Sequence, residues 1–194
     1  MRSLSVIAAC FIATLAAASP ALADSPSAFE RPFAIAAYGA VRGGDYLAGG
    51  VGGRLRWEPL SWLGIEVYLE ATHVEWPGAL RHDYPNGFNL YVPIRAGNFR
   101  VRPFFGFCDV LSFVEPSAPG APRADDVMFG AHAGIGAEWS FHSHWSVFID
   151  GQIDVYAGHD RASGGWTGNV DEELRPFFTA QLNLGVQLHF GAPR

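Results

Sequence analysis

Apolar and polar residues alternate with a period of two along most of this chain. Between Leu63 and Thr72 the odd-numbered residues are all apolar, and the even-numbered ones are Gly, Glu, Tyr or Thr. Similar alternation runs from Trp145 to Tyr156 and from Phe178 to Phe190. A strand places alternate side chains on opposite faces, whereas a helix would scatter these apolar residues around its circumference. The pattern therefore predicts β-strands.

The same criterion, applied along the whole chain, predicts eight strands. Their ranges are Phe33–Arg42, Val51–Glu58, Leu63–Thr72, Leu90–Gly97, Val101–Val114, Val127–Phe141, Trp145–Tyr156 and Phe178–Phe190. In the fifth range the parity slips between Gly106 and Asp109, which predicts a β-bulge there.

The connections between the predicted strands alternate in length. Those at Pro59–Ser61, Gly97–Phe99 and His142–His144 are tight, whereas most of the others are long and rich in Gly, Pro and polar residues. The long ones are Pro77–Gly87, Pro116–Asp126 and Ala157–Glu173. Short turns at one rim and long loops at the other are typical of an outer-membrane barrel.

The first residues predict a secretory signal peptide. Arg2 is followed by an apolar run from Leu4 to Ala18, and an A-x-A site ends at Ala23. A lipobox-like Ile7–Cys10 offers a rival reading, but almost no apolar run precedes Cys10. We therefore divide the chain into a signal peptide (1–23), an N-terminal lead-in (24–32), a barrel (33–190) and a C-terminal tail (191–194).

Composition adds to the strand pattern. Only 16% of residues are charged and the formal net charge is -6, with no basic run, which argues against a nucleic-acid partner. Beyond the signal peptide no apolar run is long enough for a membrane helix, and Cys108 is the single cysteine, so no intramolecular disulfide can form. An exported chain of low charge can still reside in a membrane as a closed β-barrel, because strand pairing satisfies its backbone polar groups.

At this point the chain resembles the small eight-stranded outer-membrane β-barrel proteins over nearly all of its mature length. The resemblance rests on the strand count, the rhythm of loop lengths and the C-terminal strand Ala180–Phe190, which ends in an aromatic residue. It implies an all-β fold, an eight-stranded antiparallel up-and-down transmembrane β-barrel in the outer membrane. It also implies recognition of Phe190 by the barrel insertion machinery, although four further residues, Gly191–Arg194, follow it.

A soluble exported ligand-binding barrel, with its apolar face inward, is the alternative. Against it, the polar face is rich in Gly, Asn, Gln and Tyr, and aromatic residues stand at strand ends on the apolar face. Such aromatics form the girdles of membrane barrels at the lipid interfaces. The predicted girdle residues are Phe33, Trp57, Trp139, Phe141, Trp145, Phe178 and Phe190.

If the polar face lines the lumen, its charges must pair, because an eight-stranded barrel is just wide enough for side chains to fill it. We predict a charge network that plugs the barrel, or at most leaves a narrow, weakly cation-selective pore, since carboxylates outnumber arginines in the polar-face set. The network is predicted to comprise Arg54, Arg56, Arg95, Glu66, Glu70, Glu138 and Asp150.

A lipid A-modifying enzyme is the second alternative, because a deacylase of this class needs a His and a Ser together on an outer-leaflet strand. The segment His142–Ser146 has these residue types but falls in a short turn, and His73 and His82 have no serine nearby in sequence. We therefore predict no catalytic site, no metal site and no cofactor.

The expected partners are outer-membrane lipid, lipopolysaccharide and the barrel insertion machinery, and no nucleic acid is expected. The protein is expected to be a monomer that serves envelope structure or surface interaction. A weaker hypothesis places divalent cations at Asp125–Asp126 and Asp171–Glu173 in the long loops.

Overall fold

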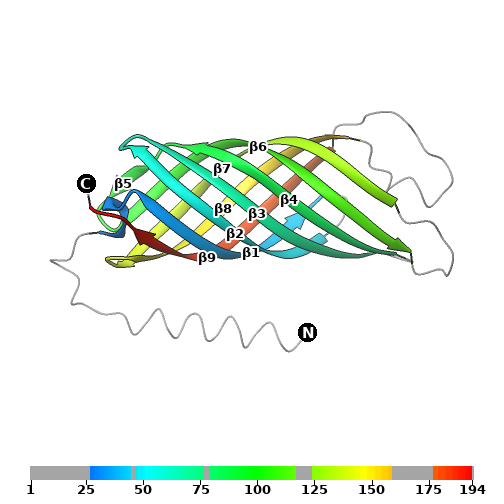
Figure 1. The fold of residues 1–194 in the computed structure, drawn as a ribbon, viewed down its shortest axis with the longest axis horizontal. Coiled ribbons are helices and arrows are strands. Elements are labelled where there is room, and N and C mark those ends of the chain that lie inside the picture. Colours follow the sequence, from blue (N-terminus) through cyan, green and yellow to red (C-terminus); the bar gives the residue numbers. More distant parts are fainter. Residues whose placement is uncertain (1–26, 45–46, 77–78, 117–123, 159–176, 194) are drawn as a thin grey trace, which may run out of the picture.

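The computed structural model describes residues 27–44, 47–76, 79–116, 124–158 and 177–193, nearly all of them in strands (Figure 1). One short 3-10 helix precedes the strands. The elements are η1 (Ala28–Glu30), β1 (Phe33–Gly43), β2 (Leu47–Leu60), β3 (Leu63–Trp76), β4 (Ala79–Tyr91), β5 (Ile94–Ala96), β6 (Phe99–Pro116), β7 (Ala124–His142), β8 (Trp145–Gly158) and β9 (Phe177–Phe190).

The strands form one closed antiparallel barrel. Consecutive strands pair, except that β4 pairs with β6 and not with β5, and β1 pairs with β9 from Phe33↔Phe190 to Gly43↔Ala180, which closes the sheet. β4 and β5 both pair with β6, so they are two parts of one barrel strand, interrupted at Val92–Pro93. The barrel therefore has eight strands, and the predicted all-β, eight-stranded antiparallel up-and-down fold is confirmed.

The connections at the two rims differ in length only partly as predicted, because 117–123 and 159–176 are long whereas 45–46 and 77–78 span two residues each. Residues 61–62, 97–98 and 143–144 make two-residue turns at one end, where η1 and the C-terminal residues also lie, and we call this end the short-turn rim (Figure 1). Gly97 has a positive φ of 58°, which a residue without a side chain adopts without strain. The opposite end, where 45–46, 77–78, 117–123 and 159–176 connect the strands, is the long-loop rim.

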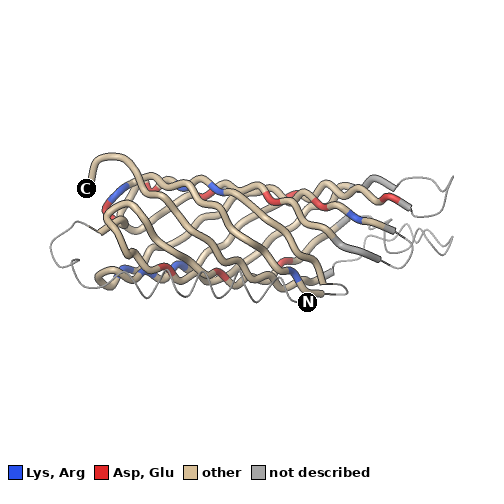
Figure 2. Tube along the Cα trace, turned by 90° about the horizontal axis from the view of Figure 1, so that it is seen from below, with Lys and Arg blue, Asp and Glu red and all other residues tan. Residues whose placement is uncertain are grey.

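The barrel is apolar outside and polar inside. On β1, for example, Ala34, Ala36 and Tyr38 face inward and are buried, whereas Phe33 and Ile35 face outward and are exposed. Large apolar side chains are exposed on the outer face all around the barrel, whereas most of the arginines and carboxylates of the strands are buried. Figure 2 shows that these charged residues occur along the length of the barrel. A soluble protein rarely exposes so much contiguous apolar surface. The alternation therefore has the polarity of a transmembrane barrel, opposite to that of a soluble ligand-binding barrel.

No helix in the described part of the chain is long and apolar enough to cross a membrane.

Two local predictions were wrong. Most of the predicted loop Pro77–Gly87 lies in β4, because the polar residues Arg81 and Asp83 face the lumen as a pair and do not mark a solvated turn. The predicted bulge between Gly106 and Asp109 is also absent, since β6 keeps one register with β4 and β7 through these residues. Its parity appeared to slip because three apolar residues, Phe104, Cys108 and Val110, face inward. The register shifts among the described strands occur instead at Trp57/Leu60 and Ser140/His142.

Aromatic side chains inside the barrel lie over glycines on the neighbouring strand. A Cβ added to any of these glycines would overlap the aromatic ring that now covers the glycine backbone. Glycine thus creates room for a large ring in a narrow lumen. The pairs are Tyr38 with Gly52, Tyr91 with Gly64, Phe104 with Gly134, Phe148 with Gly185, and Tyr156 with Gly130.

Replacing Gly64 with alanine is expected to lower the free energy of unfolding by about 1–3 kcal/mol, because the new methyl group forces the Tyr91 ring from its position. Gly151→Ala is the matched control, since a Cβ there meets no atom within 4 Å. The measurement is urea unfolding of the refolded barrel in lipid vesicles. Equal stability of the two variants would contradict the role assigned to Gly64.

Candidate functional site

A layer of ion pairs crosses the lumen between β2, β3 and β8. The Nη1 atom of Arg54 lies 2.5 Å from Oδ2 of Asp150 and 3.3 Å from Oε2 of Glu66. The Nε atom of Arg56 lies 2.5 Å from the same Glu66 oxygen, and its Nη1 contacts Glu138 on β7. These five residues are almost wholly buried. The structure therefore brings together most of the charges predicted for the lumen.

Glu138 has three arginine partners, as many as Glu66, which pairs with Arg54, Arg56 and Arg102. Besides Arg56, Glu138 contacts two arginines of β6, with Oε2 against Arg100 and Oε1 2.7 Å from Nε of Arg102. Arg102 also lies 2.8 Å from Asp150, so β6 is tied to the same layer. The pairing of β6 with β7 brings Arg100 and Glu138 together, because they lie directly opposite each other in the register. Glu138 thus holds three guanidinium groups that have almost no access to water.

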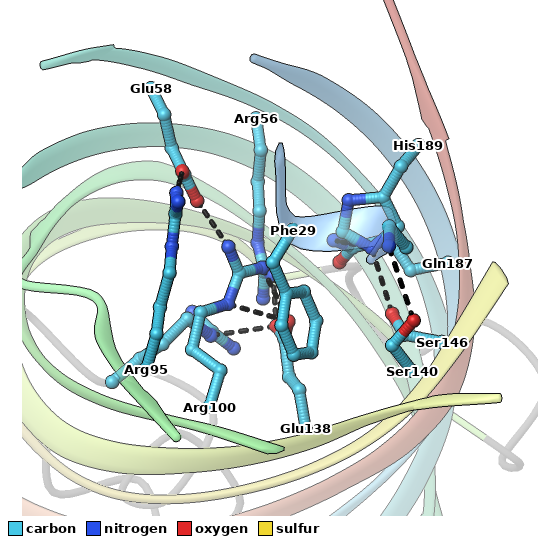
Figure 3. Close-up of polar contacts among 12 residues, drawn as sticks. Phe29, Arg56, Glu58, Arg95, Arg100, Glu138, Ser140, Ser146, Gln187 and His189 are labelled. Atoms are coloured by element: carbon cyan, nitrogen blue, oxygen red, sulfur yellow. Dashed lines mark hydrogen bonds and ion pairs between the residues drawn. The ribbon is translucent and has the colours of Figure 1, made fainter. Parts of the chain in front are cut away.

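A second set of contacts lies toward the short-turn rim, around Glu58 (Figure 3). The Oε2 atom of Glu58 is 2.5 Å from Nη2 of Arg95, and its Oε1 contacts Arg100 and accepts a hydrogen bond of 3.1 Å from the Tyr91 hydroxyl. The Arg95 side chain is 31% exposed. Arg95 was predicted to pair with Glu66, Glu70, Glu138 or Asp150, and this was wrong. It stands on β5 at the rim, so the carboxylate within its reach is Glu58.

Glu70 also has partners other than those predicted. It lies nearer the long-loop rim than Glu66, further along β3, and it is 3.4 Å from Arg42 of β1. The Nε2 atom of Gln181 donates to it at 2.8 Å. Within the described strands, no ion pair joins Glu70 to Arg54, Arg56 or Arg95. The lumen charges thus form successive groups along the barrel axis rather than the single group that was predicted.

Further polar groups fill the part of the lumen toward the long-loop rim. Arg81 lies 2.7 Å from Asp83, whose Oδ1 accepts a 2.5 Å hydrogen bond from Ser112. The Nε2 atom of His132 is 2.5 Å from Oδ1 of Asn89, and its Nδ1 is 4.0 Å from Asp154.

Sequence reasoning omitted several lumen residues from the network. They are Arg42, Glu58, Arg81, Asp83, Arg100, Arg102, His132 and Asp154. Arg102, for example, is the fourth residue of β6 and is buried. A parity count begun at Phe99 would have placed both β6 arginines inside.

Aromatic rings pack against the buried guanidinium groups. The Cζ atom of Arg54 lies 3.6 Å from the ring centroid of Phe148, and that of Arg102 lies 5.2 Å from the centroid of Tyr91. A desolvated cation over an aromatic face is electrostatically favourable. The arginines are therefore held by ion pairs at their edges and by aromatic rings at their faces.

Residue Phe29 of η1 enters the lumen from the short-turn rim (Figure 3). Its side chain is buried, with Cζ of Arg100 4.3 Å above its ring and the His189 ring 5.7 Å away in an edge-on contact. The backbone N–H of Ala28 donates to Oγ of Ser140 at 3.3 Å, and Nη1 of Arg31 donates to the Gly191 carbonyl at 2.6 Å. The lead-in thus lies in this mouth of the barrel, a position that its sequence did not predict.

Six of the predicted girdle residues lie near the short-turn rim. Phe33, Trp57, Trp145 and Phe190 are exposed on the outer face, and Phe33 stacks on Phe190 with 5.7 Å between ring centroids. Trp139 and Phe141 are half-buried and contact each other, with centroids 6.2 Å apart. Phe178 lies toward the long-loop rim, opposite Val155, and is 65% exposed. Six of the seven predicted girdle residues therefore lie around the short-turn rim, and Phe178 lies toward the long-loop rim.

In the part of the chain that the structure describes, no histidine and serine form the outer-leaflet pair that a lipid deacylase would use. Oγ of Ser146 lies 2.8 Å from Nε2 of His189, but both side chains are buried inside the barrel near Phe29. Ser143 and His144, whose Oγ and Nδ1 atoms are 3.0 Å apart, lie in a turn at the short-turn rim. Among the described residues no group of three or more His, Cys, Asp and Glu side chains could hold a metal ion.

Known structures share this fold. A major outer membrane protein of Thermus thermophilus aligns with a TM-score of 0.58 and 14% identity, covering 82% of this chain and 99% of its own. OprG of Pseudomonas aeruginosa aligns with a TM-score of 0.58 and 12% identity, over 87% and 99% of the two chains. Neisserial surface protein A gives 0.54 and 14%, over 83% and 97%. No protein-family model and no curated protein sequence matches this chain.

These neighbours are small eight-stranded outer-membrane β-barrel proteins, and the resemblance that the sequence indicated is confirmed at the level of the fold. A fold of this kind accommodates different functions, so function has to be argued from the lumen and the surface.

Proposed function

We propose that this protein is a non-catalytic outer-membrane barrel whose lumen is closed by its own side chains, and that it serves envelope structure or surface interaction. The observation that carries the proposal is the layer of buried ion pairs around Glu138, with Phe29 above it at the short-turn rim. A lumen filled in this way supports a closed scaffold rather than an open channel.

The outer membrane is the location that the exposed apolar face supports. After signal-peptide export, Phe190 at the end of β9 would be read by the insertion machinery, and lipid and lipopolysaccharide would cover the outer face. Closure of β1 on β9 leaves no free sheet edge, which agrees with a monomer. The loop acids proposed to bind divalent cations, Asp125–Asp126 and Asp171–Glu173, lie where the structure does not describe the side chains.

Any residual leak is not expected to prefer cations strongly. The sequence indicated an excess of lumen carboxylates, but among the inward-facing residues whose side chains the structure describes, arginines and carboxylates are equal in number. The arginines are Arg42, Arg54, Arg56, Arg81, Arg95, Arg100 and Arg102, and the carboxylates are Glu58, Glu66, Glu70, Asp83, Glu138, Asp150 and Asp154. The charge count that suggested weak cation selectivity therefore no longer favours it.

Planar-bilayer recording tests the closed lumen. The refolded protein is expected to give no steady open-channel current, since the ion-paired side chains in the lumen are almost wholly buried. The Arg54→Ala variant, which removes partners of Asp150 and Glu66, is expected to leak and to unfold at lower urea. A steady ohmic current through the wild-type protein would contradict the proposal, as would an Arg54→Ala variant unchanged in both respects.

Two other experiments distinguish the alternatives. If the protein modifies lipid A, the lipid A mass spectrum will change when its gene is deleted and recover on complementation; we expect no change, because Ser146 and His189 are inaccessible to lipid chains. If it is a soluble exported barrel, it will fractionate with periplasmic proteins. We expect it in the outer-membrane fraction, with gel migration that changes on boiling.

A further inference from the structure

Two histidines face each other on the outer surface of the β3–β4 hairpin. His73 and His82 are directly paired in the antiparallel register, three pairs below the strand ends at Trp76↔Ala79. Their Nδ1 atoms are 3.4 Å apart, and their ring centroids are 4.9 Å apart. His73 is exposed and His82 is half-buried. The lumen network described above does not include either residue.

The separation of the two nitrogens suits a bridging metal ion better than a direct hydrogen bond. Nitrogen donors in proteins hydrogen-bond at about 2.7–3.2 Å, so 3.4 Å is long for a direct contact. Two nitrogens that each lie about 2.0–2.1 Å from one tetrahedral zinc ion are separated by about 3.3–3.4 Å. The observed Nδ1 positions therefore match two ligand positions of a tetrahedral site.

We propose that His73 and His82 bind one divalent transition-metal ion, zinc by geometry, across the β3–β4 hairpin. Imidazole nitrogen is a ligand that suits zinc, copper and nickel. The pair supplies two ligands, and water would occupy the remaining positions, so the site stays open to a further ligand and binds more weakly than a closed four-ligand site. No metal site was predicted from the sequence, because only the cross-strand register brings the two residues together.

The surroundings leave the site accessible. On β2 the residue opposite His73 is Gly49, and a Cβ added there would meet no atom within 4 Å. Along the outer face of β3 the apolar series that includes Val67 and Leu69 ends at His73. The pair therefore lies at the long-loop end of the apolar surface, where water and ions reach a membrane barrel.

The other exposed histidine pair lacks this geometry. His142 and His144, in the turn between β7 and β8, have ring centroids 6.0 Å apart. Nδ1 of His144 is 3.0 Å from Oγ of Ser143, and Nδ1 of His142 is 3.4 Å from the His144 backbone nitrogen. The Ser143 contact occupies Nδ1 of His144, and the two rings lie further apart than those of His73 and His82, so this pair provides an internal control.

Isothermal titration of the refolded, untagged protein with Zn²⁺ in detergent micelles tests the proposal. Wild type is expected to bind one ion per chain, with the thermal unfolding midpoint raised by Zn²⁺ because the ion binds only the paired strands. His73→Ala and His82→Ala are each expected to weaken zinc binding by at least about 10- to 100-fold. A loss of that size is typical when a residue that hydrogen-bonds to a metal ligand is removed, and loss of the ligand itself should cost no less. The double variant His142→Ala/His144→Ala should bind like wild type.

Copper provides an independent signature. With one equivalent of Cu²⁺ the electron paramagnetic resonance spectrum of wild type is expected to show coupling to two nitrogens, and that of either single variant to one nitrogen or none. Migration on unboiled gels establishes that each variant is folded, which it should be because both residues lie on the surface. Zinc binding that survives His73→Ala, or that is lost equally in the His142→Ala/His144→Ala control, would overturn the proposal. The outcome does not depend on whether the lumen conducts.

Discussion

Substitution of Glu138 by glutamine is expected to lower the free energy of unfolding by about 3–5 kcal/mol, the range for removing one charged partner from a buried ion pair. The carboxylate contacts Arg56, Arg100 and Arg102, and all four side chains are nearly inaccessible to water. Glutamine keeps the volume and removes the charge, so three guanidinium groups would remain buried with too little negative charge. Urea unfolding in lipid vesicles measures the loss.

Glu30→Gln serves as the matched control for this experiment, because it makes the same chemical change in η1, at a half-buried carboxylate without an ion pair in the described part of the chain. Its stability should be close to that of wild type. The double variant Glu138→Gln/Arg100→Gln should lose less than the sum of the single changes, since the two residues share one interaction. If Glu138→Gln were as stable as the control, the ion-pair layer would not stabilise the barrel.

Truncation of Phe29 to alanine is the second change for which we expect a large effect. The ring is 1% exposed and packs against Arg100 and His189, so its loss should cost about 3 kcal/mol, at the lower end of the range for buried phenylalanines. It should also open the short-turn mouth to small solutes. Thermal unfolding with and without the substitution measures the first effect.

Cysteine labelling measures the second effect. In a Cys108→Ala background, Ser146→Cys places a thiol beside His189 near Phe29, where the native side chain is inaccessible. A water-soluble thiol reagent should label it slowly when Phe29 is present and much faster in the Phe29→Ala variant. Ser143→Cys, in the turn at the same rim, should react equally fast in both backgrounds. Fast labelling of Ser146→Cys with Phe29 in place would show that the lead-in does not close the mouth.

Much of the fold followed from a pattern with a period of two. The alternation in Leu63–Thr72 and Trp145–Tyr156 predicted strands that β3 and β8 contain, because a half-exposed strand must separate polar and apolar side chains. The alternation criterion failed where charged lumen residues resemble a solvated loop and where apolar residues face the lumen. Arg81 and Asp83 were assigned to a loop because they are polar, although they face the lumen. In β6 the inward-facing apolar residues Phe104, Cys108 and Val110 made a regular register look irregular.

A network of charged residues in the lumen was predictable from the sequence, but only some of its ion pairs were. Arg54, Arg56, Glu66, Glu138 and Asp150 were assigned to the lumen by parity, and they lie within one set of contacts. The partners of Arg95 and Glu70 were not predictable, because a contact across the lumen depends on the height of each residue along the barrel axis. That height follows from strand tilt and stagger, which parity does not contain.

By itself, then, the sequence determined the class of fold, the apolar outer face and the polar lumen, since these depend on which residue types alternate along each strand. The tertiary structure decided which arginine contacts which carboxylate, that Phe29 enters the lumen, and that His73 and His82 face each other. These contacts join residues far apart in the chain or on opposite arms of a hairpin. They exist only when the barrel closes with one register, because a shift of a single residue would turn every side chain of a strand to the other face.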